Sequence, residues 1–346
     1  MQPEITIQAA IAKIVEGEHL ARHEARDVMT NIMEGAATAA QIGSLVTALR
    51  MKGETIEEIT GFAEIMRSKS NRVHTQQHDL LDTCGTGGDG ADTFNISTTS
   101  ALVAAAGGIR VAKHGNRAMS SKSGSADVLE ALGVSIQLNS VQAALCLKKV
   151  GICFMFAQQY HQSMKYAAVP RREIGIRTIF NLLGPLTNPA GADRQLLGVY
   201  DRSKTELIAH VLQALDLKRG LVVASFDGLD EISISAATQV TELKDGKIRS
   251  YEVTPDDLGL RASSLKDIVG GDAATNAEII RHIFAGEHGA RRDIVLANTG
   301  ACFYVAGRCS TLQEGVKLAA SIIDNKLALA KLNELIQITG ELSHVS

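Results

Sequence analysis

The sequence predicts an α/β protein in which a small all-helical domain precedes a larger α/β domain with a mainly parallel central sheet. Two observations lead to this prediction. Residues 4 to 70 show only helical periodicity, with apolar residues three and four positions apart. From residue 80 onward, short apolar runs alternate with helical patterns, which is typical of a parallel sheet covered by helices. We expect the helical domain over residues 1–70, completed by a helical segment at about 165–185, and the α/β domain over residues 78–164 and 190–346.

Glycines divide the first seventy residues into four short amphipathic helices. Gly17, Gly35 and Gly53 mark the breaks, and Thr55 with Glu58 forms a predicted capping box at the start of the fourth helix. Four short helices cannot easily bury all their apolar faces among themselves. We therefore expect this block to pack on the rest of the chain or on a second copy of it.

Short apolar runs predict the strands of the sheet, and helical patterns lie between them. Asp245-Gly246 is typical of a hairpin turn between two later strands, and four helical segments are expected after residue 273. Pro170 is expected to begin a helix that ends at Gly184. The other strands are predicted at residues 80–81, 109–112, 134–138, 152–156, 195–200 and 221–225.

The composition is that of an ordinary globular protein and restricts the classes of function. The 346 residues are 45% hydrophobic and 21% charged, and the net charge of −3 provides no general field for nucleic acid or an anionic membrane. Anion binding must therefore be local. Five scattered cysteines without C-x-x-C spacing are interpreted as reduced core residues, and no segment approaches the length of an apolar membrane span. We expect a cytoplasmic protein.

A glycine cluster between a predicted strand and a predicted helix forms the first candidate anion site. Gly85, Gly87, Gly88 and Gly90 precede a helix that opens at Asn95-Ile96-Ser97-Thr98. Glycines let backbone N–H groups approach an anion closely, and a helix start offers unpaired N–H donors. This stretch is typical of a phosphate cradle.

The next strand leads into a second loop with different chemistry. Lys113-His114-Gly115-Asn116-Arg117 is followed by Ser120-Ser121-Lys122-Ser123-Gly124 and by a helix that begins near Ser125 and ends at Gly133. Three cations and four hydroxyls in one loop are suited to a polyanion. Lys113 and Arg117 are the expected phosphate contacts, since the loop offers them no apolar face to cover.

Two common nucleotide folds fit this stretch poorly. Gly85, Gly87 and Gly90 match G-x-G-x-x-G, but Lys113-His114 stands where a dinucleotide fold needs an acid for the ribose. No Walker sequence occurs. Asp89 inside the loop would repel a bare diphosphate, so it indicates either a bond to ribose hydroxyls or a divalent cation beside the phosphate.

Asp230-Glu231 follows a predicted buried strand, at the edge where open α/β sheets bind ligands. Adjacent acids there are often only a solvated turn. Beside a phosphate cradle, however, they suit Mg²⁺, which prefers one or two protein carboxylates together with substrate phosphates and water. The Ser97 hydroxyl could add a ligand.

Other charged residues have two interpretations each. Arg171 and Arg172 are predicted at a helix start, where the macrodipole disfavours cations. They are either a surface pair or a fork for a planar carboxylate. His114 and His161 are either general bases or histidines that satisfy local hydrogen bonds.

Over essentially its whole length the chain resembles the anthranilate phosphoribosyltransferase family. The resemblance lies in an ordered set of motifs: GTGGDG at 85–90, NIST at 95–98, KHGNRAMSSKSGSADVLEALG at 113–133, FAQQYH at 156–161, GIRTIFNLLGPLTNPA at 175–190 and DE at 230–231. It implies Mg²⁺-dependent transfer of phosphoribose from 5-phosphoribosyl 1-pyrophosphate (PRPP) to anthranilate, in tryptophan biosynthesis. It also implies a homodimer formed through the helical domain.

The resemblance implies roles for individual residues. Ser97, Asp230 and Glu231 would hold the metal, and Lys113 would stabilise the leaving group with it, without any protein nucleophile. Gly85, Asn116 and Arg171 would hold anthranilate. PRPP would be held by Gly85, Gly88, Asp89, Thr93, Asn95, Ile96, Ser97, Thr98, Lys113, His114, Gly115, Asn116, Arg117, Ala118, Met119, Ser120, Ser121 and Ser125.

Two competing functions remain at the level of sequence. A pyrimidine nucleoside phosphorylase is similar in fold and also uses a lysine-containing glycine-rich loop, but it would bind free phosphate and a nucleoside without a metal pair. A nucleic-acid-binding member of the wider superfamily should carry a basic groove, whereas this chain is slightly acidic and lacks basic runs with interleaved aromatic residues.

Overall fold

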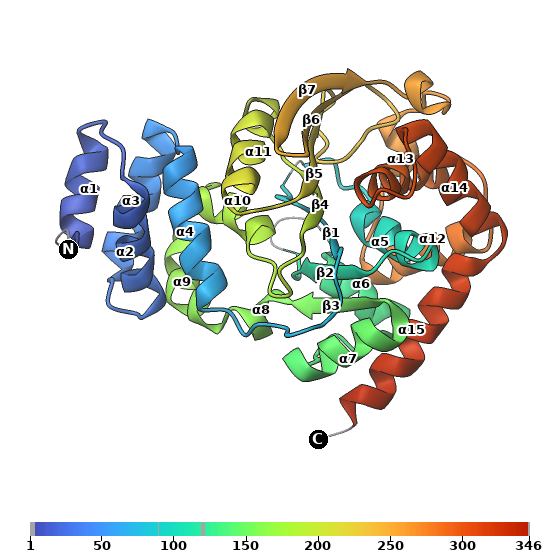
Figure 1. The fold of residues 1–346 in the computed structure, drawn as a ribbon, viewed down its shortest axis with the longest axis horizontal. Helices are drawn as coiled ribbons and strands as arrows, with labels where there is room; N and C mark the ends of the chain where they lie inside the picture. Colours follow the sequence, from blue (N-terminus) through green and yellow to red (C-terminus); the bar gives the residue numbers. More distant parts are fainter. Residues whose placement is uncertain (1–3, 89, 119–121, 345–346) are drawn as a thin grey trace.

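A computed structural model describes residues 4–88, 90–118 and 122–344. The chain begins with four helices at one end of the molecule: α1 (Ile7–Val15), α2 (Arg22–Met33), α3 (Ala39–Lys52) and α4 (Ile56–Ser68) (Figure 1). The predicted capping box is confirmed, because the Thr55 hydroxyl accepts the Glu58 N–H at 3.3 Å and the Glu58 carboxylate accepts the Thr55 N–H at 2.9 Å. Gly53, with a φ of 90°, ends α3.

A seven-stranded sheet forms the centre of the larger part, in the order β3-β2-β1-β4-β5-β6-β7. The first five strands along the chain pair in parallel, and β6 and β7 add an antiparallel hairpin at one edge. The fold class predicted from the sequence is confirmed. The strands are β1 (Leu81–Gly85), β2 (Val111–Gly115), β3 (Ile152–Phe156), β4 (Arg194–Gly198), β5 (Arg219–Ser225), β6 (Thr238–Lys244) and β7 (Lys247–Val253).

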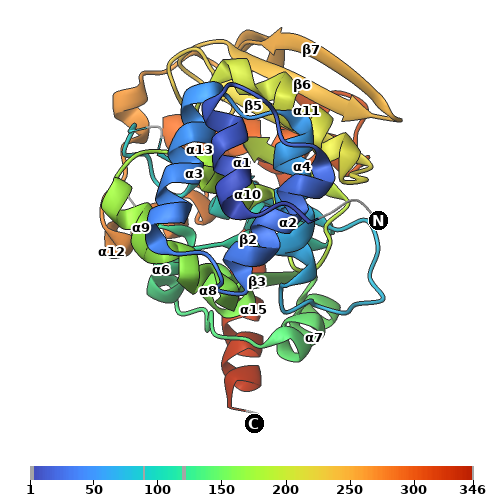
Figure 2. The same cartoon turned by 90° about the vertical axis from the view of Figure 1, so that its left-hand side faces the viewer.

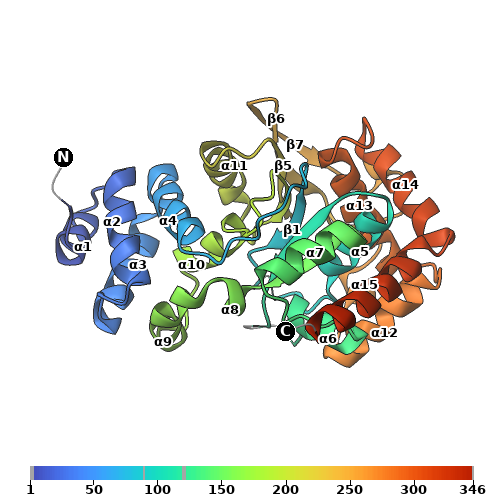
Figure 3. The same ribbon diagram turned by 60° about the horizontal axis from the view of Figure 1, so that its bottom comes forward.

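Helices cover both faces of the sheet. One face packs against α5 (Ile96–Ala106) and α13 (Ala290–Val305), and behind them lie α14 (Leu312–Asp324) and α15 (Leu327–Ser343). α7 and α15 lie side by side in Figure 3 and are in contact. The remaining helices of this part are α6 (Ser125–Leu132), α7 (Ser140–Val150), α8 (Ala157–Tyr160) and α12 (Ala273–Phe284).

The helical block shares its core with the opposite face of the sheet. α11 (Thr205–Ala214) packs on β5 and β6, and α4 packs on α11. One hydrophobic cluster therefore runs from Ile14 and Phe62 through Leu212 to Val222 on the sheet. Figure 2, seen from the helical end, shows α1–α4 in front of the sheet. The expectation that this block docks on the rest of the chain is confirmed, because its apolar faces are buried there.

Two further helices connect the parts. α9 (Lys165–Ile174) packs on α2 and α3, and α10 (Ile179–Leu183) packs on α3 and α4. A short 3₁₀ turn, η2 (Gly184–Leu186), then leads back toward β4. These contacts support the domain boundaries given above, which stay a prediction. No helix among the described residues has the length and apolar character needed to cross a membrane.

Three expectations about elements were wrong. Residues 134–138 have the alternating burial of a strand, but they pair with no other strand; their apolar side chains pack into the core, and the Ser135 N–H donates to the Thr339 hydroxyl at 3.1 Å. β2 runs to Gly115, so Lys113 and His114 lie in the strand and not in the loop. Pro170 lies inside α9, and Gly175, with a φ of 67°, ends that helix before α10 begins.

Candidate functional site

The ends of β1 and β4 meet the loop that carries Asp230. A Cβ atom at Gly198 would lie 1.6 Å from the Asp230 carbonyl oxygen, and one at Gly85 would lie 2.3 Å from Asp230 Oδ2. Only glycine fits at position 198, where the clash is with backbone, whereas a larger residue at position 85 would displace the Asp230 carboxylate. The Gly87 N–H donates to Asp230 Oδ2 at 2.8 Å. The structure therefore brings together two motifs that lie far apart in the sequence.

The loop from β5 to Glu231 is held by hydrogen bonds on both sides. The Asp227 carboxylate accepts the hydroxyls of Ser225, Ser233 and Ser235, of which the Ser233 bond is 2.6 Å long. Burial raises the pKa of Asp227, but these hydroxyls outweigh it and lower the pKa. The fully buried Asn298 of α13 accepts the Ile232 N–H at 3.0 Å and donates to the Ile232 carbonyl at 2.9 Å. Neither Asp227 nor Asn298 was predicted as a site residue from the sequence.

The N-terminus of α5 points its first turn at the same region. Asn95 occupies the N-cap position but makes no capping bond with its side chain. Instead its amide donates to the Ser123 carbonyl and accepts from the Asn276 amide, both at 3.0 Å. Asn95 thus ties the first loop to the second. The Ile96 N–H donates to the Phe94 carbonyl at 2.8 Å, so the N–H groups of Ser97 and Thr98 are the ones that a phosphate at this helix start would meet.

Lys113 is the buried cation of the site. Its side chain is 3% exposed; Nζ donates to the Thr83 carbonyl of β1 and lies 3.4 Å from the Ser97 hydroxyl. Strand β2 therefore aims the ammonium at the start of α5. A buried ammonium needs an anionic partner more than an exposed one does, because little water solvates it.

Asp82, next to Lys113 across the strands, was not predicted. Its carboxylate accepts the His114 N–H at 3.1 Å and the Asn188 amide at 2.7 Å. Burial raises the pKa of Asp82 to about 6, although the charge of Lys113 and the Asn188 bond oppose that shift. The bonds fix β2 against β1 and against the turn at Asn188. An acid inside the apolar strand sequence LLDTCG was the signal that could have revealed it.

The second loop closes tightly on the start of α6. A Cβ atom at Gly115 would lie 2.2 Å from the Ser125 hydroxyl, and the Ser125 hydroxyl donates to the Asn116 carbonyl at 3.2 Å. Arg117 is already paired, since Nη1 contacts Asp127 at 2.8 Å and Glu130 at 2.6 Å. These two carboxylates raise the pKa of Arg117. Asp89, Met119, Ser120 and Ser121 of the predicted site lie outside the described residues.

His114 and His161 face each other, with ring centroids 5.0 Å apart. Nε2 of His161 lies 3.1 Å from the Thr187 carbonyl, to which a neutral imidazole donates. Burial lowers the pKa of His114 to about 3 and that of His161 to about 4. The contacts support local bonding for His161, one of the two interpretations given above, and the pair is neutral near pH 7.

The histidine pair should make folding sensitive to acid. In the unfolded chain these histidines take up protons below about pH 6.5, whereas in the folded chain they do so only near pH 3 to 4. The contribution of the pair to the free energy of unfolding is therefore fully present above pH 6.5 and declines as the pH falls toward 4. Asp82 acts in the opposite direction, because its folded pKa is raised. Urea unfolding at pH 7 and pH 5 should show a weaker pH dependence in His161→Gln than in the unchanged chain, since Asp82 titrates in both. Equal pH dependence would contradict the assignment.

Arg171 lies in the last turn of α9, not at a helix start, so the macrodipole favours it there. Its guanidinium stacks 5.1 Å from the centroid of Phe180, and burial lowers its pKa. The neighbouring Arg172 is exposed. The predicted position of Arg171 and Arg172 at a helix start was wrong, and the burial of Arg171 supports Arg171 over Arg172 as the functional arginine.

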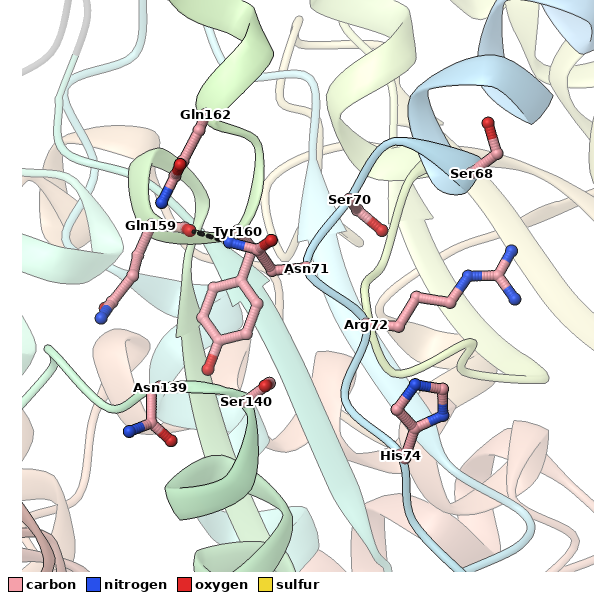
Figure 4. A pocket seen from close by; sticks show the side chains of 10 residues that line it. All are labelled: Ser68, Ser70, Asn71, Arg72, His74, Asn139, Ser140, Gln159, Tyr160 and Gln162. Atoms are coloured by element: carbon pink, nitrogen blue, oxygen red, sulfur yellow. Dashed lines mark hydrogen bonds between the residues drawn. The ribbon is translucent and has the colours of Figure 1, made fainter.

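A cleft with polar walls lies away from these residues. Its volume is about 590 Å³, and Figure 4 shows it between the linker that follows α4, the start of α7 and the segment around α8. The Asn71 amide donates to the Gln159 carbonyl at 3.0 Å across it. None of the predicted site residues lines this cleft. Its walls are formed by Ser68, Ser70, Asn71, Arg72, His74, Asn139, Ser140, Gln159, Tyr160 and Gln162.

The donor set at the site fits a hard cation. Asp230, which accepts the Gly87 N–H, and the adjacent Glu231 carry carboxylates, and Ser97 carries a hydroxyl 3.4 Å from Lys113 Nζ. Mg²⁺ takes oxygen ligands of this kind and usually completes its shell with water and phosphate. Among the described residues there is no group of three or more histidine, cysteine or acidic side chains placed to hold a metal.

Comparison with known proteins agrees with the fold. The model of a glycosyl transferase family helical bundle domain matches residues 8–70, and the model of the glycosyl transferase family a/b domain matches residues 77–329. The fold and the site thus define a glycosyl transferase made of a helical bundle and an α/β domain.

Individual relatives are more specific. An anthranilate phosphoribosyltransferase of Brevibacillus brevis is 54% identical over 337 residues, covering 97% of this chain and 99% of the relative. The chain belongs to the anthranilate phosphoribosyltransferase family. The crystal structure of the enzyme of that name from Thermus thermophilus superimposes with a TM-score of 0.91 at 40% identity, over 96% of this chain and 99% of that one.

A third relative was solved with its ligands. Anthranilate phosphoribosyltransferase from Saccharomyces cerevisiae, in complex with PRPP and Mg, has a TM-score of 0.89 at 26% identity, over 98% of this chain and 99% of that one.

Proposed function

We propose that this protein transfers the phosphoribosyl group of PRPP to the amine of anthranilate, giving N-(5-phosphoribosyl)anthranilate and pyrophosphate, in tryptophan biosynthesis. The observation that carries the proposal is the contact of Asp230 with Gly85, Gly87 and Gly198. It joins Asp230 of the acidic pair to the glycine loop that precedes α5, and a metal-bound diphosphate requires an acid, a glycine loop and a helix start together. Family membership supports the particular substrates.

The two glycine-rich loops are the proposed PRPP site. The diphosphate side would be held by Gly85, Gly88, Thr93 and the start of α5 at residues 95–98. The cradle would be completed by residues 113–118 with Ser125. For Asp89 and residues 119–121 the proposal comes from the sequence alone. Asn95 supports this grouping, because it bonds directly to Ser123 and so connects the two loops.

Mg²⁺ is the proposed cofactor, held by Asp230, Glu231 and Ser97. When bound it would neutralise charge on the diphosphate. The presence of Mg in the complex of the yeast relative with PRPP supports this assignment.

The proposed reaction breaks the bond between C1 of the ribose and the pyrophosphate oxygen and forms a bond from C1 to the amine nitrogen, which then loses one proton. A neutral arylamine attacks from the opposite side without prior deprotonation, so no protein nucleophile is needed. Catalysis then depends on positioning and on charge. Lys113 stabilises the departing pyrophosphate from its buried position between β1 and α5, while Gly85, Asn116 and Arg171 hold anthranilate.

Changing Arg171 to alanine should raise the KM for anthranilate far more than the KM for PRPP. The guanidinium held against Phe180 can pair with the anthranilate carboxylate through two N–H donors. Truncation removes this charge-assisted pair, which contributes about 1.5–3 kcal/mol, so the KM for anthranilate should rise roughly 10- to 100-fold. Steady-state kinetics with each substrate varied in turn measures the difference. Arg172→Ala on the same helix is the control, and an equal rise in both KM values for Arg171→Ala would reject this role.

A fluorescence assay tests the function itself. Anthranilate fluorescence should fall when PRPP and Mg²⁺ are added to the pure protein, and it should persist when EDTA is present or PRPP is omitted. Phosphorolysis of thymidine or uridine without loss of anthranilate would instead support a pyrimidine nucleoside phosphorylase.

The remaining proposals concern assembly and location. We propose a homodimer formed through the helical domain, supported by exposed apolar side chains there, such as Val15 at 70% and Met51 at 84% exposure. A monomer mass in sedimentation at micromolar concentration would reject it. The five cysteines are all free thiols, which supports a cytoplasmic protein.

A further inference from the structure

Arg177 lies in the segment between α9 and α10 and reaches the glycine loop. A Cβ atom at Gly88 would lie 3.1 Å from Arg177 Nε and 3.2 Å from Nη2. The guanidinium therefore lies directly against the backbone of the loop that precedes α5. At Gly87 and Gly90 of the same loop, a Cβ atom would meet nothing within 4 Å.

An aromatic platform holds the Arg177 guanidinium in place. Its carbon lies 4.5 Å from the centroid of the Tyr200 ring. Tyr200 is in turn tied to the glycine loop, because its N–H donates to the Thr86 hydroxyl at 3.1 Å and the Thr86 N–H donates to the Gly198 carbonyl at 2.9 Å. Platform and loop therefore form one unit, and the orientation of the guanidinium is set relative to the loop.

Arg177 makes no ion pair or hydrogen bond with any described residue, in contrast to Arg117. Arg117 lies in the loop that follows β2, but its guanidinium is paired with Asp127 and Glu130. The arginine that has its donors available is thus the one beside Gly88. A guanidinium presents five N–H donors in a plane and matches phosphate oxygens in pairs.

We propose that Arg177 binds the diphosphate of PRPP and completes the phosphate cradle from the side of the helical segment. The diphosphate is the group concerned because Gly87, next to Gly88, bonds to the carboxylate of the proposed metal ligand Asp230. Charge grows on the diphosphate as its bond to the ribose breaks, so a fixed guanidinium stabilises the transition state more than the bound substrate. The inference rests on the proposed function.

Truncation of Arg177 should weaken the phosphate site and leave the anthranilate site intact. Arg177→Ala should lower kcat/KM for PRPP by about 100-fold, as removal of one preorganised donor to a developing anion does, with the KM for anthranilate changed by less than about threefold. Arg177→Lys should recover part of the loss, because it keeps the charge but not the paired donors. The matched control is Arg172→Ala, which truncates an exposed arginine on the neighbouring helix α9. Its kinetic constants should equal those of the unchanged protein.

Binding of pyrophosphate, measured by calorimetry with Mg²⁺ present, separates this role from a structural one. Arg177→Ala should bind pyrophosphate at least about tenfold more weakly while its melting temperature stays close to that of the control. Unchanged pyrophosphate affinity, or a loss confined to anthranilate, would overturn the inference. If the unchanged protein bound pyrophosphate but transferred no phosphoribose, the proposed function would fail and the Arg177 comparison would still be decided by binding.

Discussion

Replacing Asp230 and Glu231 together with alanine should lower kcat/KM by on the order of 10²–10³-fold at moderate Mg²⁺, the largest loss expected in this chain. The pair supplies the carboxylates of the proposed metal site, and Asp230 also accepts the Gly87 N–H, so the change removes both the cation's ligands and one support of the glycine loop. The Mg²⁺ dependence of the rate is the direct measurement. The variant should need far more Mg²⁺ for half-maximal activity.

A remote acid provides the control for that variant. Asp257 accepts the Thr254 N–H and hydroxyl at 2.8 and 2.6 Å in a surface turn, and Asp257→Ala should leave the Mg²⁺ dependence unchanged. Near-normal activity of the double variant would remove Asp230 and Glu231 from the metal site. Melting temperatures of both variants show whether a lost activity reflects the site or the fold.

Gly198→Ala should damage both stability and activity, although this residue carries no functional group. The added Cβ would lie 1.6 Å from the Asp230 carbonyl, so either β4 or the Asp230 loop must move. Overpacking of this kind costs about 1–3 kcal/mol of stability, and the displaced loop would no longer present its carboxylate to Gly87. We expect a lower melting temperature together with at least a tenfold loss of kcat.

Gly340→Ala is the matched control for the glycine change. Gly340 lies inside α15, where a Cβ would meet nothing within 4 Å. Alanine there should raise stability by about 0.5–1 kcal/mol because it favours the helix, and activity should not change. If Gly198→Ala were equally harmless, the close approach of Asp230 to β4 would be wrong.

The sequence predicted those parts of the fold that depend on local chemistry. Thr55 and Glu58 identified a helix start, Gly133 a helix end and Asp245-Gly246 a hairpin, because each encodes its backbone geometry within a few residues. The alternation of strand and helix after residue 80 likewise indicated the parallel sheet. Both candidate anion-binding loops were recognisable because glycines and helix starts form a local pattern.

The rest depended on contacts between distant segments. Asp230 meets Gly85 because β4 lies between β1 and β5 in the sheet, an order that no local pattern specifies. Arg171 was misplaced because the helix begins at Lys165, before Pro170, and the proline is accommodated inside it. The pairing of Arg117 with Asp127 and Glu130, and the position of Arg177 against Gly88, follow from tertiary packing and could not be read from spacing.

A crystal structure of the protein with PRPP and Mg²⁺ bound would locate the diphosphate. We expect it between the loop at residues 85–90, the N-terminus of α5 and the carboxylates of Asp230 and Glu231, with Lys113 within hydrogen-bonding reach. PRPP bound in another place, such as the cleft beside Tyr160, or a diphosphate with Asp230 and Glu231 turned away from it, would rule out the proposed site.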